Sequence, residues 1–166
     1  MEMLLSVLKT IPEYGLLLST VQKDHNAAVT GIGQINRSHL IAGICHDLNR
    51  PAVIITQDDM AAKRLQEELK AFLGDTAPVL PSRELTLYDT AVVSRAWEQK
   101  RLRQLYDLKQ GNTPLQILSW DALSQRTVPP AVLLHAAFSM EVGKEYDIDE
   151  LTNRLTGAGY TRCVRV

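Results

Sequence analysis

The stretch 29–36 is the part of the chain whose residue types and spacing come nearest to a known chemistry. A working phosphate-binding loop (P-loop) reads G-x-x-x-x-G-K-[ST]: its glycine amides cradle the phosphates, its lysine neutralises their charge and its hydroxyl holds Mg²⁺. If Gly33 is placed on the last glycine, Ala28 stands where the first glycine belongs. Gln34 then replaces the lysine, and Ile35 replaces the hydroxyl-bearing residue. The stretch keeps a glycine turn and lacks the groups that do the chemistry.

These replacements predict that the chain does not hydrolyse nucleotides. A neutral amide cannot replace a cation that faces a triphosphate, and an isoleucine offers no oxygen to Mg²⁺. Charge-assisted contacts are about twice as strong as neutral hydrogen bonds, and phosphoryl transfer depends on them. We therefore expect no catalytic, cofactor-binding or metal-binding residues, and we assign a degenerate P-loop to Gly31, Gly33, Gln34 and Ile35. An unrelated turn between a strand and a helix remains the alternative for these residues alone.

The composition describes a globular chain without a strong charge bias. Of its 166 residues, 45% are hydrophobic and 22% are charged, so it can build a core and fits one domain or one domain plus part of a second. A net charge of -1 gives no general attraction to nucleic acid or membranes. Cys45 and Cys163 stand far apart, and the four histidines have no metal-ligand spacing with them. No apolar run approaches the roughly 20 residues of a membrane span, and we expect a cytoplasmic protein.

The hydrophobic periodicity predicts an α/β fold that lies behind the glycine turn. Alternating strand and helix patterns predict a parallel sheet with helices on both faces, because right-handed crossovers join such strands. The expected strands are 27–31, 52–56, 78–80 and 115–118, and the expected helices are 2–10, 13–24, the segment with apolar residues from Leu40 to Leu48, the segment from Asp58 or Asp59 to Gly74, and 92–110. The run 52–56 is β-branched without interruption, which predicts a strand covered on both faces.

The pattern changes after about Ala136. The alternation of Phe138, Met140 and Val142 predicts a strand, Asp147 opens a helix, and 160–166 again predicts a strand. We therefore expect a first domain over 1–136 and the beginning of a small α+β domain over 137–166.

Arg101 interrupts the apolar stripe of the long helix 92–110, four residues after Trp97 and four before Leu105. An unpaired guanidinium among apolar residues is costly, so we expect an ion pair with Glu84 or Asp89. The same helix carries five basic residues that could contact phosphate, although a solvated face is the plainer interpretation: Arg95, Lys100, Arg101, Arg103 and Lys109.

Six short motifs between residues 78 and 160 follow one another in the order found in one protein family. They are Pro81, Ser82, Arg83 and Glu84 with Leu87, Tyr88 and Asp89; Arg101 and Leu102 with Leu105 and Leu108; Ala122, Leu123 and Gln125; Pro129 and Pro130; Val142 and Gly143 with Asp149, Glu150 and Leu151; and Gly159 and Tyr160. In these motifs the chain resembles the N-terminal region of bacterial transcription-repair coupling factors, which is similar to the excision-repair protein UvrB. The first 77 residues match mainly by pattern.

The resemblance implies a fold and a set of motif residues. It implies a helicase-like first domain that has lost its Walker lysine, as at Gln34, followed by the start of a UvrB-like interaction domain. The family-motif residues carried over are Arg83, Glu84, Tyr88, Asp89 and Arg101. UvrB itself is the nearer rival, but its P-loop is intact and it has a long DNA-clamping hairpin for which 90–100 leave too little chain.

The resemblance also implies a role without catalysis for this chain. Full-length members of the family are ATP-driven DNA translocases that use Mg²⁺, act on RNA polymerase and double-stranded DNA through other domains, and recruit UvrA. We expect the key UvrA contacts beyond residue 166, and Arg162 and Arg165 receive no role. Two other classes stay open: a P-loop enzyme, whose acidic motif is missing because Asp149 and Glu150 start a helix, and a DNA-binding module that uses the basic face of 95–109.

Overall fold

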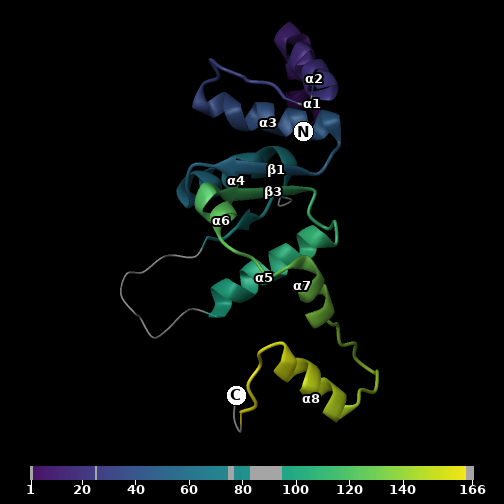
Figure 1. The fold of residues 1–166 in the computed structure, drawn as a ribbon. Helices are drawn as coiled ribbons and strands as arrows, with labels where there is room; N and C mark the ends of the chain where they lie inside the picture. Colours follow the sequence, from purple (N-terminus) through teal and green to yellow (C-terminus); the bar gives the residue numbers. More distant parts are fainter. Residues whose placement is uncertain (1, 25, 75–76, 83–94, 164–166) are drawn as a thin grey trace, which may run out of the picture. The chain divides into compact units, whose positions relative to one another are not determined.

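The computed structural model describes residues 2–24, 26–74, 77–82 and 95–163. They form two compact units, 1–125 and 126–166 (Figure 1). The first unit is built around a parallel sheet of β1 (Ala52–Thr56), β2 (Val79–Leu80) and β3 (Leu115–Ser119), with the strand order β1-β3-β2. Ile54 of β1 and Val79 of β2 both lie opposite Ile117 of the central strand. The prediction of a parallel sheet flanked by helices is confirmed for these three strands.

The helices lie close to where the periodicity predicts them. In the first unit they are α1 (Glu2–Ser6), the 3-10 helix η1 (Val7–Thr10), α2 (Pro12–Asp24), α3 (Gln34–Leu48), α4 (Asp59–Leu73), α5 (Arg95–Lys109) and α6 (Trp120–Ser124). Local chemistry explains the ends of α4. The Asp58 carboxylate accepts a hydrogen bond from the Ala61 N–H at 2.7 Å, and Gly74, at φ +71°, ends the helix in a conformation that favours glycine.

The strand predicted at 27–31 is wrong. The segment has no regular structure, its side chains are exposed and Val29 keeps 49% of its surface accessible. A strand needs a hydrogen-bonded neighbour, and within the described part of the sheet β1 pairs with β3 alone. Small side chains such as Ala27 and Ala28 bury little apolar surface, so packing does not hold the segment extended.

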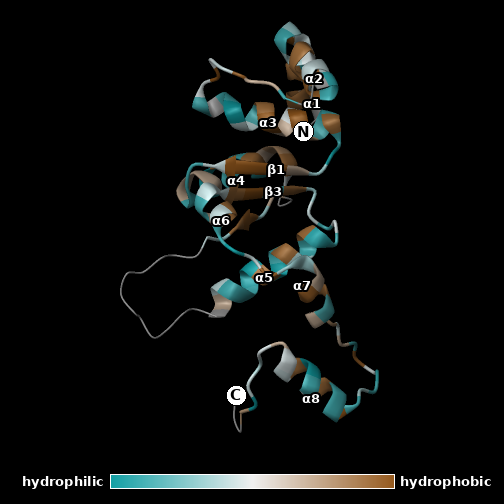
Figure 2. Ribbon diagram, in the orientation of Figure 1, coloured by the Kyte–Doolittle hydropathy of each residue, from teal (hydrophilic) through white to brown (hydrophobic). Residues whose placement is uncertain are grey.

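The core of the first unit lies on both faces of β3, but β1 is covered on one face only. α3 and α4 cover one face of the sheet, where Ala42, Leu69 and Ile117 are fully buried. On the other face Leu80 and Leu118 pack with Ala122 of α6 and with Leu105 of α5. Val53 and Ile55 are 56% and 51% exposed, which corrects the prediction that both faces of 52–56 are covered. Figure 2 shows the apolar character of these strands.

The segment formed by α1 and η1 meets α2 at a sharp bend before Pro12. Pro12 starts α2, as the sequence predicts, because its missing N–H has no partner to lose in a first helical turn. No single helix in the described ranges is long and apolar enough to cross a membrane, although Met3–Thr10 and Pro12–Lys23, bent by 90°, satisfy the length and composition criteria as a pair.

The second unit contains α7 (Pro130–Ala136) and α8 (Ile148–Gly157), and its described residues form no strand where strands were predicted. Residues 138–142 have no regular structure, Val142 is fully exposed, and 160–163 are also irregular, while 164–166 lie outside the described residues. The predicted start of α8 is confirmed, since the Asp147 carboxylate accepts hydrogen bonds from the Asp149 and Glu150 N–H groups. The domain boundary predicted at 136 stays a prediction; the two compact units separate at 125.

Candidate functional site

The glycine loop opens α3 as predicted, although no strand precedes it. Gly31 has φ +79°, in the left-handed region that favours glycine, and Gly33 is the N-cap residue of α3 without a side-chain hydrogen bond. Gln34 and Ile35 form the start of the helix, and the side chain of Ile35 lies outside the described atoms. The loop therefore has glycine geometry but not the strand-loop-helix support of a P-loop.

A cleft of about 710 Å³ lies beside this loop, and its walls do not suit a polyphosphate. The loop 27–33 forms one wall, and η1, α2 and α3 form the others. Leu16, Leu17 and Leu40 contribute apolar surface, and Glu13 is an acidic group in the lining. Among the described residues that line the cleft there is no lysine or arginine. A triphosphate placed here would lose hydration without gaining a compensating cation.

A polar cluster at the carboxyl ends of the strands is the second candidate. Asp59, just after β1, accepts hydrogen bonds from the hydroxyls of Ser82, just after β2, and Ser119, at the end of β3. Burial alone would raise the pKa of the Asp59 carboxyl, but the hydrogen bonds from Ser119 and Ser82 outweigh it and lower this pKa below its usual value. The cluster joins the carboxyl ends of all three strands.

Arg101 belongs to the same cluster and is only 6% exposed. Its Nη1 donates to the Pro81 carbonyl at 2.7 Å, and its Nη2 donates to the Ala122 carbonyl at 3.0 Å. The guanidinium also lies 5.9 Å from the centre of the Trp97 ring, whose Nε1 donates to the Ser82 carbonyl at 2.6 Å. Burial lowers the pKa of Arg101, and the negative charge of Asp59 opposes this shift. These contacts satisfy the guanidinium mainly through backbone carbonyls.

The other predicted motif residues, Arg83, Glu84, Tyr88 and Asp89, lie outside the described residues. The predicted ion pair of Arg101 with Glu84 or Asp89 therefore stays a prediction. The burial of Arg101 removes it from the basic face proposed for α5.

That basic face is also partly neutralised. Arg103 pairs with Asp107 at 3.0 Å, and Lys100 and Lys109 are exposed cations on the same helix. A helix surface with one of its cations buried and another paired is a weak phosphate-binding surface.

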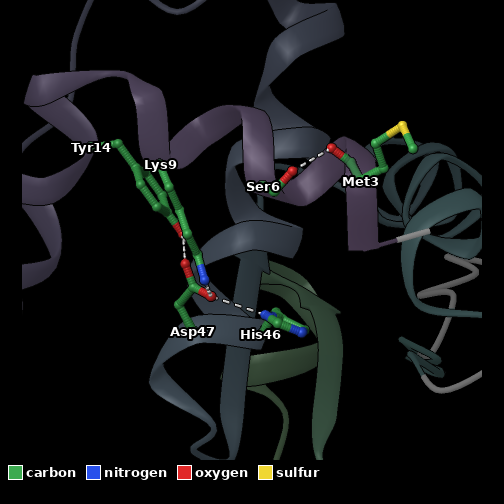
Figure 3. Close-up of polar contacts among 6 residues, drawn as sticks. All are labelled: Met3, Ser6, Lys9, Tyr14, His46 and Asp47. Atoms are coloured by element: carbon green, nitrogen blue, oxygen red, sulfur yellow. Dashed lines mark hydrogen bonds and ion pairs between the residues drawn. The ribbon is translucent and has the colours of Figure 1, made fainter.

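A second polar cluster, which the sequence did not reveal, fixes α3 to the preceding helices (Figure 3). The Tyr14 hydroxyl donates to Asp47 Oδ2 at 2.9 Å, while Lys9 Nζ and His46 Nδ1 lie 3.1 and 2.9 Å from Oδ1. Burial, and then the hydrogen bond with Asp47, raises the pKa of Tyr14. Burial would raise the pKa of Asp47, but its hydrogen bonds with His46, Lys9 and Tyr14 lower it overall.

Asp59, Ser119 and Asp47 are the polar residues that sequence reasoning missed. The first two had a usable signal, because each stands at or just after the carboxyl end of a predicted strand, where parallel sheets gather polar groups. Asp47 gave no such signal. Tyr14 and Lys9 are more than thirty positions away in the sequence, and the adjacent His46 belongs to no recognisable motif. Among the described residues, no group of three or more His, Cys, Asp or Glu side chains could hold a metal ion.

Comparison with known proteins points to one kind of protein. The chain is 33% identical over 138 residues to the transcription-repair-coupling factor of Myxococcus xanthus, which is 78% of this chain and 12% of that relative. It is 26% identical over 135 residues to that of Bacillus subtilis strain 168, and 25% identical over 146 residues to that of Staphylococcus aureus strain USA300, covering 81% and 87% of this chain and 12% of each relative. No family model and no solved structure matches.

These matches confirm the resemblance that the motifs indicate. Relatives from three genera carry the same name, and the aligned part covers about four fifths of this chain, as expected for the N-terminal region of such a factor. The chain spans about 12% of the length of the curated relatives it matches.

Proposed function

We propose that this chain, which is similar to the N-terminal part of transcription-repair coupling factors, is a non-catalytic UvrB-like module that recruits UvrA to stalled RNA polymerase in transcription-coupled DNA repair. The observation that carries the proposal is the 25–33% identity to such factors along about four fifths of the chain. The name of these relatives refers to coupling between transcription and repair, and UvrA recruitment is the step that the resemblance implies for this region.

The absence of catalysis is the part of the proposal that the residues support most directly. Gln34 replaces the lysine of a P-loop and Ile35 replaces its hydroxyl residue. The cleft beside the loop presents Glu13 and no lysine or arginine among its described lining residues. The parallel sheet β1-β3-β2 and the glycine turn before α3 support a helicase-like domain whose P-loop has degenerated. In this proposal the glycine loop has a structural role and binds no cofactor.

The remaining functions belong to other regions of the full-length relatives in this proposal. An ATP- and Mg²⁺-dependent motor would act on double-stranded DNA and RNA polymerase there, because the groups required for phosphoryl transfer are replaced in the degenerate P-loop. The resemblance implies that the key UvrA contacts of this proposal follow residue 166.

A chimera tests the recruitment role in its full-length context. The aligned region of the Bacillus subtilis factor is replaced by this chain, and the binding of purified UvrA to the chimera is measured by surface plasmon resonance. A factor lacking the same region is the control. Both variants keep the key contacts proposed to follow residue 166, so the test is whether this chain supports them. We expect the chimera to bind UvrA as the natural factor does and the deletion variant, which lacks the supporting domain, to bind it much more weakly. A chimera that unfolds normally in a thermal scan but fails to bind UvrA contradicts the proposal. Equal binding by the two variants also contradicts the proposal.

A further inference from the structure

A second cleft lies between the first half of α3 and α4, over the end of β1. It encloses about 290 Å³, and its floor is apolar, with Ile41, Ile54 and Leu65. Polar side chains from three segments surround this floor: Gln34 and Arg37 of α3, Thr56 and Gln57 at the end of β1, and Arg64 and Glu68 of α4. We call it the α3–α4 cleft. Unlike the cleft beside the glycine loop, it contains cations.

The charges of the α3–α4 cleft favour an acidic ligand. Arg37 and Arg64 are exposed, and neither has an ion-pair partner in the described part of the chain. Two arginines against Glu68 leave one net positive charge in the lining. A guanidinium presents a planar fork of donors that matches a carboxylate. Free arginine donors beside an apolar floor suit a segment with both acidic and apolar side chains.

The backbone of β1 offers hydrogen bonds at the same place. The Ala52 N–H donates to the Pro114 carbonyl at 2.9 Å, on the β3 side. Because strand residues alternate, the N–H and C=O groups of Val53 and Ile55 point away from β3. No other described strand pairs with that edge. An open edge with unpaired backbone groups is a template for an added strand.

The open edge of β1 favours an extended ligand over a helical one. A helix satisfies its backbone N–H and C=O groups internally, so it has none to offer Val53 and Ile55. An extended segment keeps these groups free to pair with the edge.

We propose that the α3–α4 cleft and the open edge of β1 bind an extended acidic segment of a partner protein. Its backbone pairs with Val53 and Ile55, its carboxylates bind Arg37 and Arg64, and its apolar side chains rest on the cleft floor. A nucleic acid fits less well, since Glu68 repels phosphate and the floor is apolar. A second copy of β1 fits less well, since Ala52–Thr56 contains no acidic residue for the arginines.

Peptide binding tests the proposal directly. The probe is a fluorescein-labelled ten-residue peptide in which pairs of valines alternate with pairs of glutamates, so that each face of the extended peptide carries both side chains. It is titrated with the 166-residue chain in a fluorescence anisotropy assay. We expect Arg37→Gln and Arg64→Gln each to weaken binding about fivefold, the scale of one charge pair at a partly exposed site, and Glu68→Gln to strengthen it about twofold. Lys63→Gln removes a neighbouring charge that does not line the cleft and should leave binding unchanged.

A second arm tests the edge without altering the protein. The same peptide, N-methylated at every second residue, cannot donate to β1 and should lose binding. Equal binding of the methylated peptide, or equal effects of Lys63→Gln and Arg64→Gln, overturns the proposal. The proposal is also overturned if a single-stranded oligonucleotide displaces the peptide and this competition depends on Arg37. It is likewise overturned if the chain sediments as a dimer and Val53→Pro abolishes that dimer. None of these outcomes changes the UvrA binding expected of the chimera, so each proposal can be contradicted without the other.

Discussion

Single buried polar residues hold the first unit together, and Arg101 is the clearest case. Its guanidinium connects the chain after β2 to α6 through the carbonyls of Pro81 and Ala122. Arg101→Ala should lower the free energy of unfolding by about 3 kcal/mol, because two buried carbonyls lose charged donors. Urea denaturation measures this. Arg103→Ala, at an exposed pair, should cost no more than about 0.5 kcal/mol. Equal costs for the two variants would show that burial of Arg101 has no energetic consequence.

Asp47 should make the stability of the first unit depend on acid. Its pKa is lowered in the folded state, so its stabilising contribution is complete above the unfolded pKa of about 3.9 and is lost as pH falls through the lower folded pKa. We expect the urea midpoint of the natural chain to fall more steeply below about pH 4 than that of Asp47→Asn. Parallel pH profiles for the two proteins would show that Tyr14 and Lys9 do not stabilise the ionised carboxylate.

At the scale of elements, the contact between α3 and the preceding helices depends on a glycine. A Cβ at Gly43 would lie 2.3 Å from Leu8 Cδ1 and 3.0 Å from the Tyr14 hydroxyl oxygen. Gly43→Ala should therefore destabilise the chain by about 1–3 kcal/mol, although alanine is the better helix former. Gly15→Ala in α2 meets nothing within 4 Å and should stabilise by about 0.5–1 kcal/mol. Thermal unfolding that gives both variants the same sign would contradict this packing.

At the scale of the whole molecule, local sequence patterns predicted the helices. Strand pairing and polar contacts depend on residues distant in the sequence and could not be predicted in the same way. The helix from Asp59 was predictable because its cap, apolar face and final glycine are all local. The strand at 27–31 was wrong because a strand depends on a neighbour that local residues do not specify. The hydrogen bonds of Asp59 with Ser82 and Ser119 were missed because these residues are far apart in the sequence and only the pairing of the strands brings them together. The glycine turn that opens α3 was predictable from Gly31 and Gly33, whereas its origin as a degenerate P-loop stays a prediction.

The proposed function treats the first unit as a domain without nucleotide chemistry that acts through contacts with other proteins. The two clefts beside the N-terminal half of α3 differ in charge. The glycine-loop cleft presents no lysine or arginine among its described lining residues, whereas the α3–α4 cleft presents Arg37 and Arg64. A domain of this kind should be indifferent to ATP while it binds protein ligands.

Isothermal titration of the 166-residue chain with Mg-ATP tests this central claim most directly. We expect no heat beyond dilution at any ATP concentration up to the millimolar range, because Gln34 and Ile35 cannot hold the phosphates and Mg²⁺. Saturable heat with a micromolar Kd, lost on removal of Mg²⁺, would contradict the account and restore a nucleotide-binding role to the loop.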